Sequence, residues 1–257
     1  CRNNPTGPQH QVLPLLLRAQ LGQLQRLALW SGGIIATLVV FIVVLVFFWQ
    51  RRKHRDLKRL SRTDQLTGLP NRHRIMNFLS EAIRSDTVDR YVLMLLDLDY
   101  FKHINDEHGH DAGDRALLEV AEEMRAFADH HNLDIGRWGG EEFLILFQAE
   151  QAEDAARLTT ELLNRIASIR TSSRSESEIR LTASAGFAPL SSLRQTPDQR
   201  IWEPALLIAD QLLYRAKKAG RNGFFGVWPT NKSAIIEPHH LDEAIESGAY
   251  RLLQRSA

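Results

Sequence analysis

The sequence predicts an α+β domain placed after a single transmembrane helix. An almost unbroken apolar run over 34–49 predicts the membrane helix, and two kinds of apolar pattern downstream of it predict the domain. The continuous apolar run Tyr91–Leu98 has the length of a buried strand, whereas Trp202–Lys218 has the amphipathic pattern of a helix. Strands and helices therefore share the downstream part of the chain, which is expected to form one mixed domain.

Composition limits the classes of protein to which the chain can belong. It has 257 residues, a formal net charge of +1, 44% hydrophobic and 25% charged residues, which fits a globular domain with an additional segment and excludes a disordered chain. The near-neutral charge argues against a nucleic-acid partner, since such proteins usually concentrate basic residues on one face. The only cysteine is Cys1, which excludes a disulfide framework and a cysteine-based zinc site. Because the chain begins with Cys1 rather than Met, we interpret it as a fragment, with a lipid-modified cysteine as the alternative.

The N-terminal part is expected to anchor the protein in a membrane. Leucines recur at helical spacing within 1–29, and the apolar segment 30–49 reaches the roughly 20 residues that cross a bilayer. A buried core helix is the alternative, but no core in this chain needs so long a helix that is apolar on every face. Lys and Arg are concentrated over 51–59, which predicts that the downstream domain is cytoplasmic, and Trp30 and Trp49 fit the two membrane interfaces.

A linker and a tight elbow are predicted before the first strand. Residues 50–63 are expected to form a charged helix that is too short to be identified as a coiled coil. In the following segment, 64–72, Gly68 and Pro70 interrupt the helix and Asn71 is placed to cap the next one. We interpret this segment as a structural elbow.

The strand predicted over Tyr91–Leu98 leads into two acidic residues. Asp97 is the metal-ligand candidate, since a buried strand would deliver its carboxylate at the end of the sheet. Asp99 is interpreted as the N-cap of a short helix over 100–105, because Asp is a preferred residue at that position. The start of such a helix leaves backbone N–H groups free, and these can bind a phosphate.

A polar loop is predicted over 105–114. Its Asp114 can accept two hydrogen bonds from the N–H groups of a guanine edge, and the Asn105 amide can both donate and accept. Helix capping and turn chemistry explain the same residues equally well. His108 and His110 have no third nitrogen or sulfur ligand nearby, so no zinc site is expected.

The segment 137–143 is predicted to form the tip of a β-hairpin. Gly139 and Gly140 lie between two extended segments, and both central positions of a tight two-residue turn need positive φ. Glu141 and Glu142 follow at the edge of the sheet, where their carboxylates can hold Mg²⁺. A solvated acidic hairpin end is the alternative, and the short motif alone does not decide between the two.

The remaining elements are expected in a regular order. Helices are predicted over 115–128, 151–169 and 202–218 and in the tail, and strands over 133–137, 143–147, 179–187 and 224–228. Lys217 and Arg221 lie four residues apart and can reach one polyanion, although the helix dipole also favours cations at a helix C-terminus. The chain has no Walker A loop, which excludes a P-loop nucleotide site.

Five motifs occur in order along the chain: Asp64-x-Leu66-Thr67-Gly68-Leu69-x-Asn71-Arg72, Asp97-Leu98-Asp99-x-Phe101-Lys102-x-x-Asn105-Asp106, Gly109-His110-x-x-Gly113-Asp114, Arg137-x-Gly139-Gly140-Glu141-Glu142-Phe143 and Tyr214-x-Ala216-Lys217-x-x-Gly220-Arg221-Asn222. Together they resemble the GGDEF family, the diguanylate cyclases, in a variant with Glu in place of the motif's Asp. The resemblance implies a palm-like nucleotidyl-cyclase fold with a five-stranded, mainly antiparallel sheet flanked by helices. The chain then divides into an N-terminal remnant (1–29), a transmembrane helix (30–49), a linker helix (50–63), the GGDEF domain (64–229) and a tail (230–257).

The resemblance also implies a role for each matching residue. The metal, Mg²⁺ or in its place Mn²⁺, would be held by Asp97, the Leu98 carbonyl, Glu141 and Glu142. Glu141, Glu142 and Lys102 would act in catalysis, and Gly139 and Gly140 would form the turn. Substrate contacts would come from Asn105 and Asp114 to guanine, from His110, and to phosphate from the backbone of Tyr100, Phe101 and Lys102 and the side chains of Lys217 and Arg221.

The family's reaction joins two GTP molecules into cyclic di-GMP and releases two pyrophosphates. Each subunit would hold one GTP, so a homodimer is required before either 3′-hydroxyl can reach the other α-phosphate. The expected location is the bacterial inner membrane, with one span and a cytoplasmic catalytic domain. The alternatives are a weakly active GTP-binding relay domain and a cyclase that uses a single nucleotide. The presence of Asp97, Glu141 and Glu142 argues against the relay domain, and Asn105 and Asp114 favour guanine.

One position departs from the family pattern. Many members carry an inhibitory Arg-x-x-Asp site where this chain has His130 and Leu133. Asp134 is displaced by one residue, which turns a side chain to the other face of an extended segment. A histidine is mostly neutral at pH 7 and lacks the planar, charged fork of arginine. No inhibitory product site is therefore predicted here.

Overall fold

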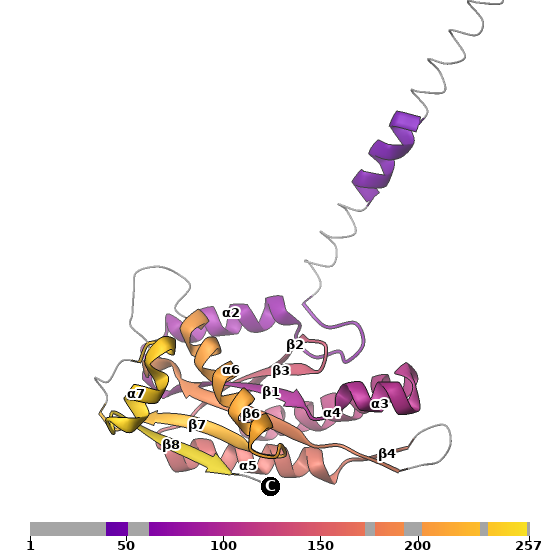
Figure 1. Cartoon of the computed structure of the whole chain (residues 1–257). Helices are drawn as coiled ribbons and strands as arrows, with labels where there is room; N and C mark the ends of the chain where they lie inside the picture. Colours follow the sequence, from indigo (N-terminus) through magenta and orange to yellow (C-terminus); the bar gives the residue numbers. More distant parts are fainter. Residues whose placement is uncertain (1–39, 51–61, 173–177, 193–201, 232–235, 256–257) are drawn as a thin grey trace, which may run out of the picture. The chain divides into compact units, whose positions relative to one another are not determined.

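The computed structural model describes residues 40–50, 62–172, 178–192, 202–231 and 236–255 (Figure 1). The chain divides into two units, Cys1–Leu60 and Ser61–Ala257. The second unit contains the predicted α+β domain.

In the first unit, residues 40–50 are helical and their large apolar side chains are exposed. Half of the membrane helix predicted over 30–49, and most of the linker helix predicted over 50–63, lie outside the described residues. The N-terminal helix predicted over 1–29 lies entirely outside them. Among the residues that the structure describes, no helix is both long and apolar enough to cross a membrane.

The second unit is organised around a mixed six-stranded sheet. Its strand order is β2-β3-β1-β6-β7-β8, and all neighbouring strands are antiparallel except the parallel pair β6 and β7. The strands are β1 (Tyr91–Leu98), β2 (Asp134–Gly139), β3 (Glu142–Gln148), β6 (Ala183–Pro189), β7 (Phe224–Pro229) and β8 (Tyr250–Arg255). The predicted mainly antiparallel arrangement is confirmed.

Helices cover both faces of this sheet, which explains the continuous apolar run of β1. Side chains alternate along a strand: Val92, Met94 and Leu96 belong to one core, whereas Leu93 and Leu95 belong to the other. The first core lies under α3 (Phe101–His108), α4 (His110–His131) and α5 (Ala152–Ser168). The second lies under α2 (Arg72–Ile83), α6 (Trp202–Lys218) and α7 (Leu241–Glu246). A strand buried on both faces is expected to be apolar at nearly every position, as β1 is.

The expectation of five strands is wrong, because the tail adds a sixth. β8 pairs antiparallel with β7 from Phe224↔Arg255 to Pro229↔Tyr250. Tyr250 is only 1% exposed and Leu241 only 2%, so the tail contributes its own apolar side chains to the second core. Burial of these side chains against the sheet favours an ordered tail, where the sequence had predicted only a short helix.

The predicted polar loop over 105–114 is also wrong, since the segment is almost entirely helical. Helix α3 ends at His108 and α4 begins at His110, so the chain changes direction at Gly109, whose φ is +83°. A side chain is disfavoured at such a φ, whereas glycine adopts it readily. A single glycine therefore makes the turn for which the sequence predicted a longer loop.

The strand predicted over 179–187 is divided between two sheets. β5 (Glu178–Arg180) pairs with β4 (Arg170–Ser172) in a separate two-stranded sheet, whereas β6 pairs with β1. In contrast, the bounds predicted for β1 and α6 are confirmed to the residue.

Candidate active site

The end of β1 brings the predicted acidic residues together. Glu142 of β3 is the register partner of Asp97 of β1. One residue further on, the Leu98 N–H donates to the carbonyl oxygen of Glu141 at 3.3 Å. Asp97 and the two acidic residues of the hairpin motif, more than 40 residues apart in the sequence, are therefore neighbours at one end of the sheet.

The hairpin turn is displaced by one residue from its predicted position. Its two central residues are Gly140 and Glu141, and Gly139 is still part of β2. Only Gly140 of the two glycines has positive φ, at +55°. The ladder register shifts between Arg137 and Gly139, which leaves Trp138 as the additional residue of a bulge. Glu141 thus stands in the turn itself rather than after it.

Arg137 ties this turn to the elbow at the start of the domain. Its Nε and Nη2 donate to the Gly140 carbonyl at 2.9 and 2.7 Å, and its Nη1 donates to Asp64 Oδ1 at 2.8 Å. Burial opposes ionisation of Asp64, but hydrogen bonds from the Thr67 backbone and from Arg137 outweigh it and hold the pKa of Asp64 below its ordinary value. The carboxylate therefore remains charged at neutral pH, and its contribution to stability is lost only as the pH falls through that lowered pKa.

The elbow itself has the expected local structure. Gly68 has a φ of +67°, and its N–H donates to the Asp64 carbonyl at 2.9 Å. Asn71 caps α2, with its side chain accepting from the Arg74 N–H at 3.1 Å. Both sequence interpretations of this segment are confirmed.

Asp97 is a buried carboxylate held against a lysine. It is 7% exposed, and Lys217 Nζ lies 2.8 Å from its Oδ1. Burial raises the pKa of Asp97 even though the ammonium of Lys217 opposes the shift. Burial likewise raises the pKa of Glu142, and the negative charge of Asp97 adds to that effect. Two adjacent carboxylates that resist ionisation indicate a place where additional positive charge is stabilised.

A second cation lies at the same end of the sheet. The Arg221 guanidinium is 4.4 Å above the centre of the Tyr100 ring, and its Nη1 donates to the Tyr100 hydroxyl at 3.2 Å. Tyr100 precedes α3 with a φ of +56°, and the first N–H groups of that helix have no partner within it. Lys217 therefore contacts Asp97 directly, whereas Arg221 contacts the residue that precedes α3.

The N-cap assignment for Asp99 is wrong. Tyr100 occupies the cap position of α3 and makes no side-chain capping hydrogen bond. The Asp99 carboxylate instead accepts hydrogen bonds from Thr182, Ser184 and Asn222. These partners are more than 80 residues away in the sequence, so no local signal predicts them.

The residues predicted to read a base lie where α3 meets α4. A Cβ atom added to Gly113 would stand 2.0 Å from Asn105 Oδ1, so the Asn105 amide occupies the space beside Gly113. Asp114 is the next residue, and His110 lies one helical turn before it on the exposed surface of α4. The close approach of the two helices thus brings the Asn105 side chain beside the residue that precedes Asp114.

The two positions that depart from the inhibitory motif are separated by the end of α4. The His130 ring packs edge-on to His131 with a centroid distance of 4.6 Å, and Leu133 packs against the first core. Asp134 is half-buried, and burial raises its pKa, with a further rise from Glu81 that Arg74 opposes.

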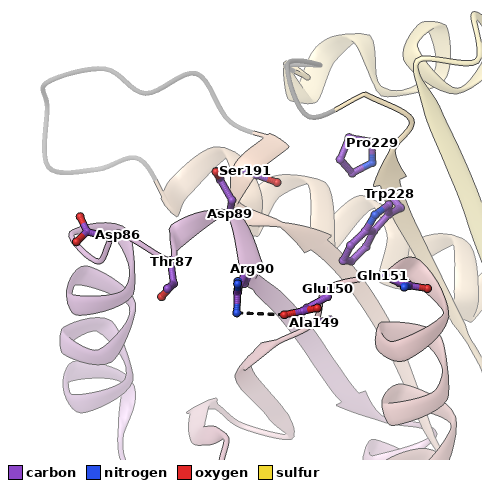
Figure 2. A pocket seen from close by; sticks show the side chains of 10 residues that line it. All are labelled: Asp86, Thr87, Asp89, Arg90, Ala149, Glu150, Gln151, Ser191, Trp228 and Pro229. Carbon is purple, nitrogen blue, oxygen red and sulfur yellow. Dashed lines mark ion pairs between the residues drawn. The ribbon is translucent and has the colours of Figure 1, made fainter.

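A separate hollow of about 390 Å³ opens near the start of β1, whereas Asp97 stands near its end (Figure 2). Its lining includes an ion pair between Arg90 and Glu150, 3.1 Å apart, and the indole of Trp228. This hollow therefore does not include the acidic residues of the candidate active site.

Comparison with known proteins assigns most of the chain to one family. The GGDEF family profile, described as "Diguanylate cyclase, GGDEF domain", matches residues 61–223. The chain belongs to the GGDEF family. This match contains all five sequence motifs, and it ends before the tail that supplies β8.

Curated relatives and solved structures show where the similarity extends. The chain is 39% identical over 177 residues to the bifunctional diguanylate cyclase/cyclic di-GMP phosphodiesterase MucR of Pseudomonas aeruginosa, covering 67% of this chain and 24% of MucR. It is 33% identical over 189 residues to the response regulator PleD of Caulobacter vibrioides, covering 69% of this chain and 40% of PleD. The chain therefore spans less than half of either relative.

Among solved structures, the chain is similar to the diguanylate cyclase SiaD of P. aeruginosa, crystallised with its activator SiaC. The TM-score is 0.56 at 30% identity, and the match covers 85% of this chain and 90% of SiaD. It is also similar to the GGDEF domain of DgcB from Caulobacter crescentus in complex with c-di-GMP. There the TM-score is 0.54 at 32% identity, covering 63% of this chain and 93% of that one.

The donor set of the GGDEF domain fits a hard divalent cation. Among the described residues, no three His, Cys, Asp or Glu side chains form a ready-made metal cluster. Mg²⁺ does not need such a cluster, because it usually binds one or two carboxylates together with waters and substrate phosphates. Asp97 and Glu142 are adjacent, burial raises the pKa of both, and Glu141 and the Leu98 carbonyl add further oxygen donors nearby. Oxygen donors alone, with their charge only partly balanced by Lys217, suit Mg²⁺ or Mn²⁺.

Proposed function

We propose that this GGDEF domain is a diguanylate cyclase that condenses two GTP molecules into cyclic di-GMP and releases two pyrophosphates. The observation that carries the proposal is the meeting of Asp97, Glu141 and Glu142 with two cations at one end of the sheet. Phosphoryl transfer needs mainly the positioning of the reacting groups and the neutralisation of charge. This end of the sheet meets that need, because it offers acidic side chains that can hold a metal and cationic side chains that can bind phosphate.

In this proposal the acidic residues hold the metal. Asp97, the Leu98 carbonyl, Glu141 and Glu142 would hold the ion, which would neutralise phosphate charge and activate the attacking hydroxyl. Glu142, whose pKa burial raises, is suited to accept the proton of that hydroxyl.

The phosphates meet the N-terminal backbone of α3 and the side chains of Lys217 and Arg221. Lys217 pairs with Asp97, so its ammonium stands where it can reach a phosphate of a nucleotide bound at this end of the sheet. Lys102, which is exposed in the first turn of α3, stabilises charge in the transition state. Asn105 and Asp114 read the guanine edge, and His110 adds a further contact to the substrate.

The decisive test is incubation of residues 56–257 with GTP and Mg²⁺, followed by separation of the products by chromatography. Cyclic di-GMP with two pyrophosphates supports the proposal. Cyclic GMP would identify a single-nucleotide cyclase, and GTP binding without turnover would identify a relay domain. ATP in place of GTP serves as the control for base selection.

Catalysis by this mechanism requires a homodimer, because each subunit presents one GTP. Removal of residues 1–55 is therefore expected to make the specific rate rise with protein concentration, since the two halves then meet only by diffusion. A leucine zipper fused before Asp64 is expected to raise the rate at least about tenfold at micromolar protein by increasing the effective concentration. A monomer whose specific rate is the same at every dilution would contradict the two-subunit mechanism.

Product feedback is expected to be weak, because His130 and Leu133 cannot provide a bidentate cation and a carboxylate. Initial rates with added cyclic di-GMP should be unchanged at low micromolar product. The double substitution His130→Arg with Leu133→Asp is expected to create inhibition, with His130→Arg alone as its control. Strong inhibition of the parent that is lost in His130→Ala would show that the native histidine forms a site after all.

We also propose that residues 30–49 anchor the enzyme in the bacterial inner membrane with the GGDEF domain in the cytoplasm. The proposal rests on the apolar span and the basic residues that follow it. The chain is expected to sediment with membranes and to require detergent for release, whereas residues 56–257 should remain in the supernatant. Release of the whole chain by salt alone would contradict an integral anchor.

A further inference from the structure

Asp99 is a buried carboxylate to which the proposed reaction assigns no role. It is 4% exposed and accepts three short hydrogen bonds. Thr182 Oγ1 and the Asn222 N–H donate to Oδ2 at 2.8 and 2.9 Å, and Ser184 Oγ donates to Oδ1 at 2.7 Å. This one side chain therefore joins the end of β1, the start of β6 and the turn between α6 and β7.

The residues beside these hydrogen bonds have an unusual backbone. Tyr100, Arg221 and Asn222 have φ values of +56°, +65° and +43°. Such values are disfavoured for residues with a side chain and persist only where the surroundings impose them. Tyr100 directly follows Asp99 in the chain, and the Asn222 N–H donates a hydrogen bond to the Asp99 carboxylate. Asp99 is therefore linked to both backbone segments with positive φ.

The strained turn determines where the phosphate-binding candidate Arg221 points. Arg221 precedes Asn222, and its guanidinium stacks on the ring of Tyr100. The stack of Arg221 on Tyr100 therefore depends on two backbone segments, one at Tyr100 and one at Arg221 and Asn222, and Asp99 links the two. Lys217 lies one helical turn before Arg221 in the sequence, at the end of α6, and pairs with Asp97.

We propose that Asp99 is a positioning residue that orients Arg221 toward the phosphates of GTP and is not a metal ligand. This inference rests on the proposed function, because it concerns the same nucleotide site. The spacing Asp97-x-Asp99 resembles a pair of metal-binding carboxylates, but the three donors around Asp99 occupy most of the lone pairs that a metal would need. Both lone pairs of Oδ2 accept, one from Thr182 and one from the Asn222 N–H, so a metal bound through Oδ2 would leave one of these donors without its acceptor.

The two roles differ in what they require of residue 99. A positioning role needs a hydrogen-bond acceptor, whereas a metal ligand needs a negative charge. In Asp99→Asn the amide oxygen can accept from Thr182 and from the Asn222 N–H, and the amide NH₂ can donate to Ser184, whose hydroxyl rotates to accept. Asp99→Ala removes every acceptor. Asp97→Asn is the matched control at a proposed metal ligand.

The experiment measures steady-state kinetics with GTP and Mg²⁺ for the full chain and for these three variants. Asp99→Asn is expected to keep kcat/KM within about threefold of the parent and to leave the Mg²⁺ dependence unchanged. Asp99→Ala is expected to raise KM for GTP about tenfold or more, the scale of one lost charge-assisted contact to phosphate. Asp97→Asn is expected to lose at least about a hundredfold in kcat/KM.

A double-mutant cycle tests whether Asp99 acts through Arg221. Arg221→Ala should raise KM for GTP, and adding Asp99→Ala to it should change KM by no more than about twofold, because the contact that Asp99 supports is already gone. If the increase in KM of the double variant equals the product of the increases in the two single variants, Asp99 acts independently of Arg221 and the proposal is overturned.

Amide hydrogen exchange supplies a readout that does not need turnover. Exchange in the peptide covering residues 220–223 is expected to be at least about tenfold faster in Asp99→Ala and close to the parent in Asp99→Asn. If Asp99→Ala does not fold, Asp99→Asn against Asp97→Asn still decides the question, and Ser184→Ala should show a smaller change in the same direction.

The outcomes also separate this inference from the proposed function. If Asp99→Asn is as impaired as Asp97→Asn, or alters the Mg²⁺ dependence, Asp99 is a metal ligand and the inference is wrong while the cyclase stands. If the parent binds GTP without turnover, calorimetric binding constants for GTP replace KM, and the same pattern of variants supports or contradicts the role of Asp99. A parent that neither binds nor converts GTP would overturn both.

Discussion

Glu141→Gln is expected to abolish the synthesis of cyclic di-GMP while leaving the fold intact. The substitution removes a charged oxygen ligand from the hairpin turn, and the loss of one preorganised electrostatic contact to a transition state costs at least about a hundredfold in rate. The backbone contact survives, because the Leu98 N–H donates to the Glu141 carbonyl rather than to its side chain. The thermal midpoint should therefore stay within about 2 °C of the parent.

Glu150→Gln is a matched control for this substitution. Glu150 follows β3 at the end opposite to the hairpin turn and forms an exposed ion pair with Arg90. Its replacement should change neither rate nor midpoint, since exposed pairs contribute little. Activity of Glu141→Gln within a few-fold of the parent would show that Glu141 does not hold the catalytic metal, and a collapsed melting curve would indicate a structural role instead.

Gly186→Ala is expected to have the largest effect on stability. Gly186 lies in β6 at the centre of the sheet, beneath α6. An added Cβ would stand 2.0 Å from the Ala209 carbonyl oxygen and 2.4 Å from the Leu213 nitrogen. These are backbone atoms of a helix, which cannot move aside as a side chain does. We expect a loss of about 3 kcal/mol in the free energy of unfolding, at the upper end of ordinary overpacking, and a midpoint lowered by roughly 6–12 °C.

Gly139→Ala provides the control for the stability measurement. An added Cβ there meets nothing within 4 Å, and Gly139 is not among the residues with positive φ. Its midpoint should therefore stay near that of the parent. A Gly186→Ala protein with an unchanged midpoint would show that α6 can move away from the sheet at little cost, and that the packing of α6 on β6 is not tight.

Much of the fold was predictable because the relevant signals are local. The run Tyr91–Leu98 is apolar at every position up to Asp97, and a strand covered on both faces requires such a run. Trp202–Lys218 was equally clear, because its apolar residues recur at helical spacing and a glycine follows shortly after its end. The turn at Gly109 was missed, because the polar residues on both sides of this glycine predict a longer loop, whereas they belong to two helices.

The candidate site was predictable to the extent that it consists of motifs. Asp97, Glu141 and Glu142 could be named from the sequence, and the register between β1 and β3 places them together. The ion pair between Lys217 and Asp97 was not predictable, since the dipole of α6 and a phosphate explained the lysine equally well. The hairpin turn was misplaced by one residue, because the bulge at Trp138 shifts the register in a way that a pair of glycines does not reveal.

The sequence by itself determined the family of this protein, the order of most of its helices and strands, and the acidic and basic residues of its site. These features depend on residue spacing and on apolar periodicity, which are properties of short segments. Only the tertiary structure decided that the tail supplies β8, that Lys217 neutralises Asp97, and that Asp99 holds the turn at Asn222. Each of these joins segments that are distant along the chain, and such contacts depend on how the sheet and its helices pack rather than on any local pattern.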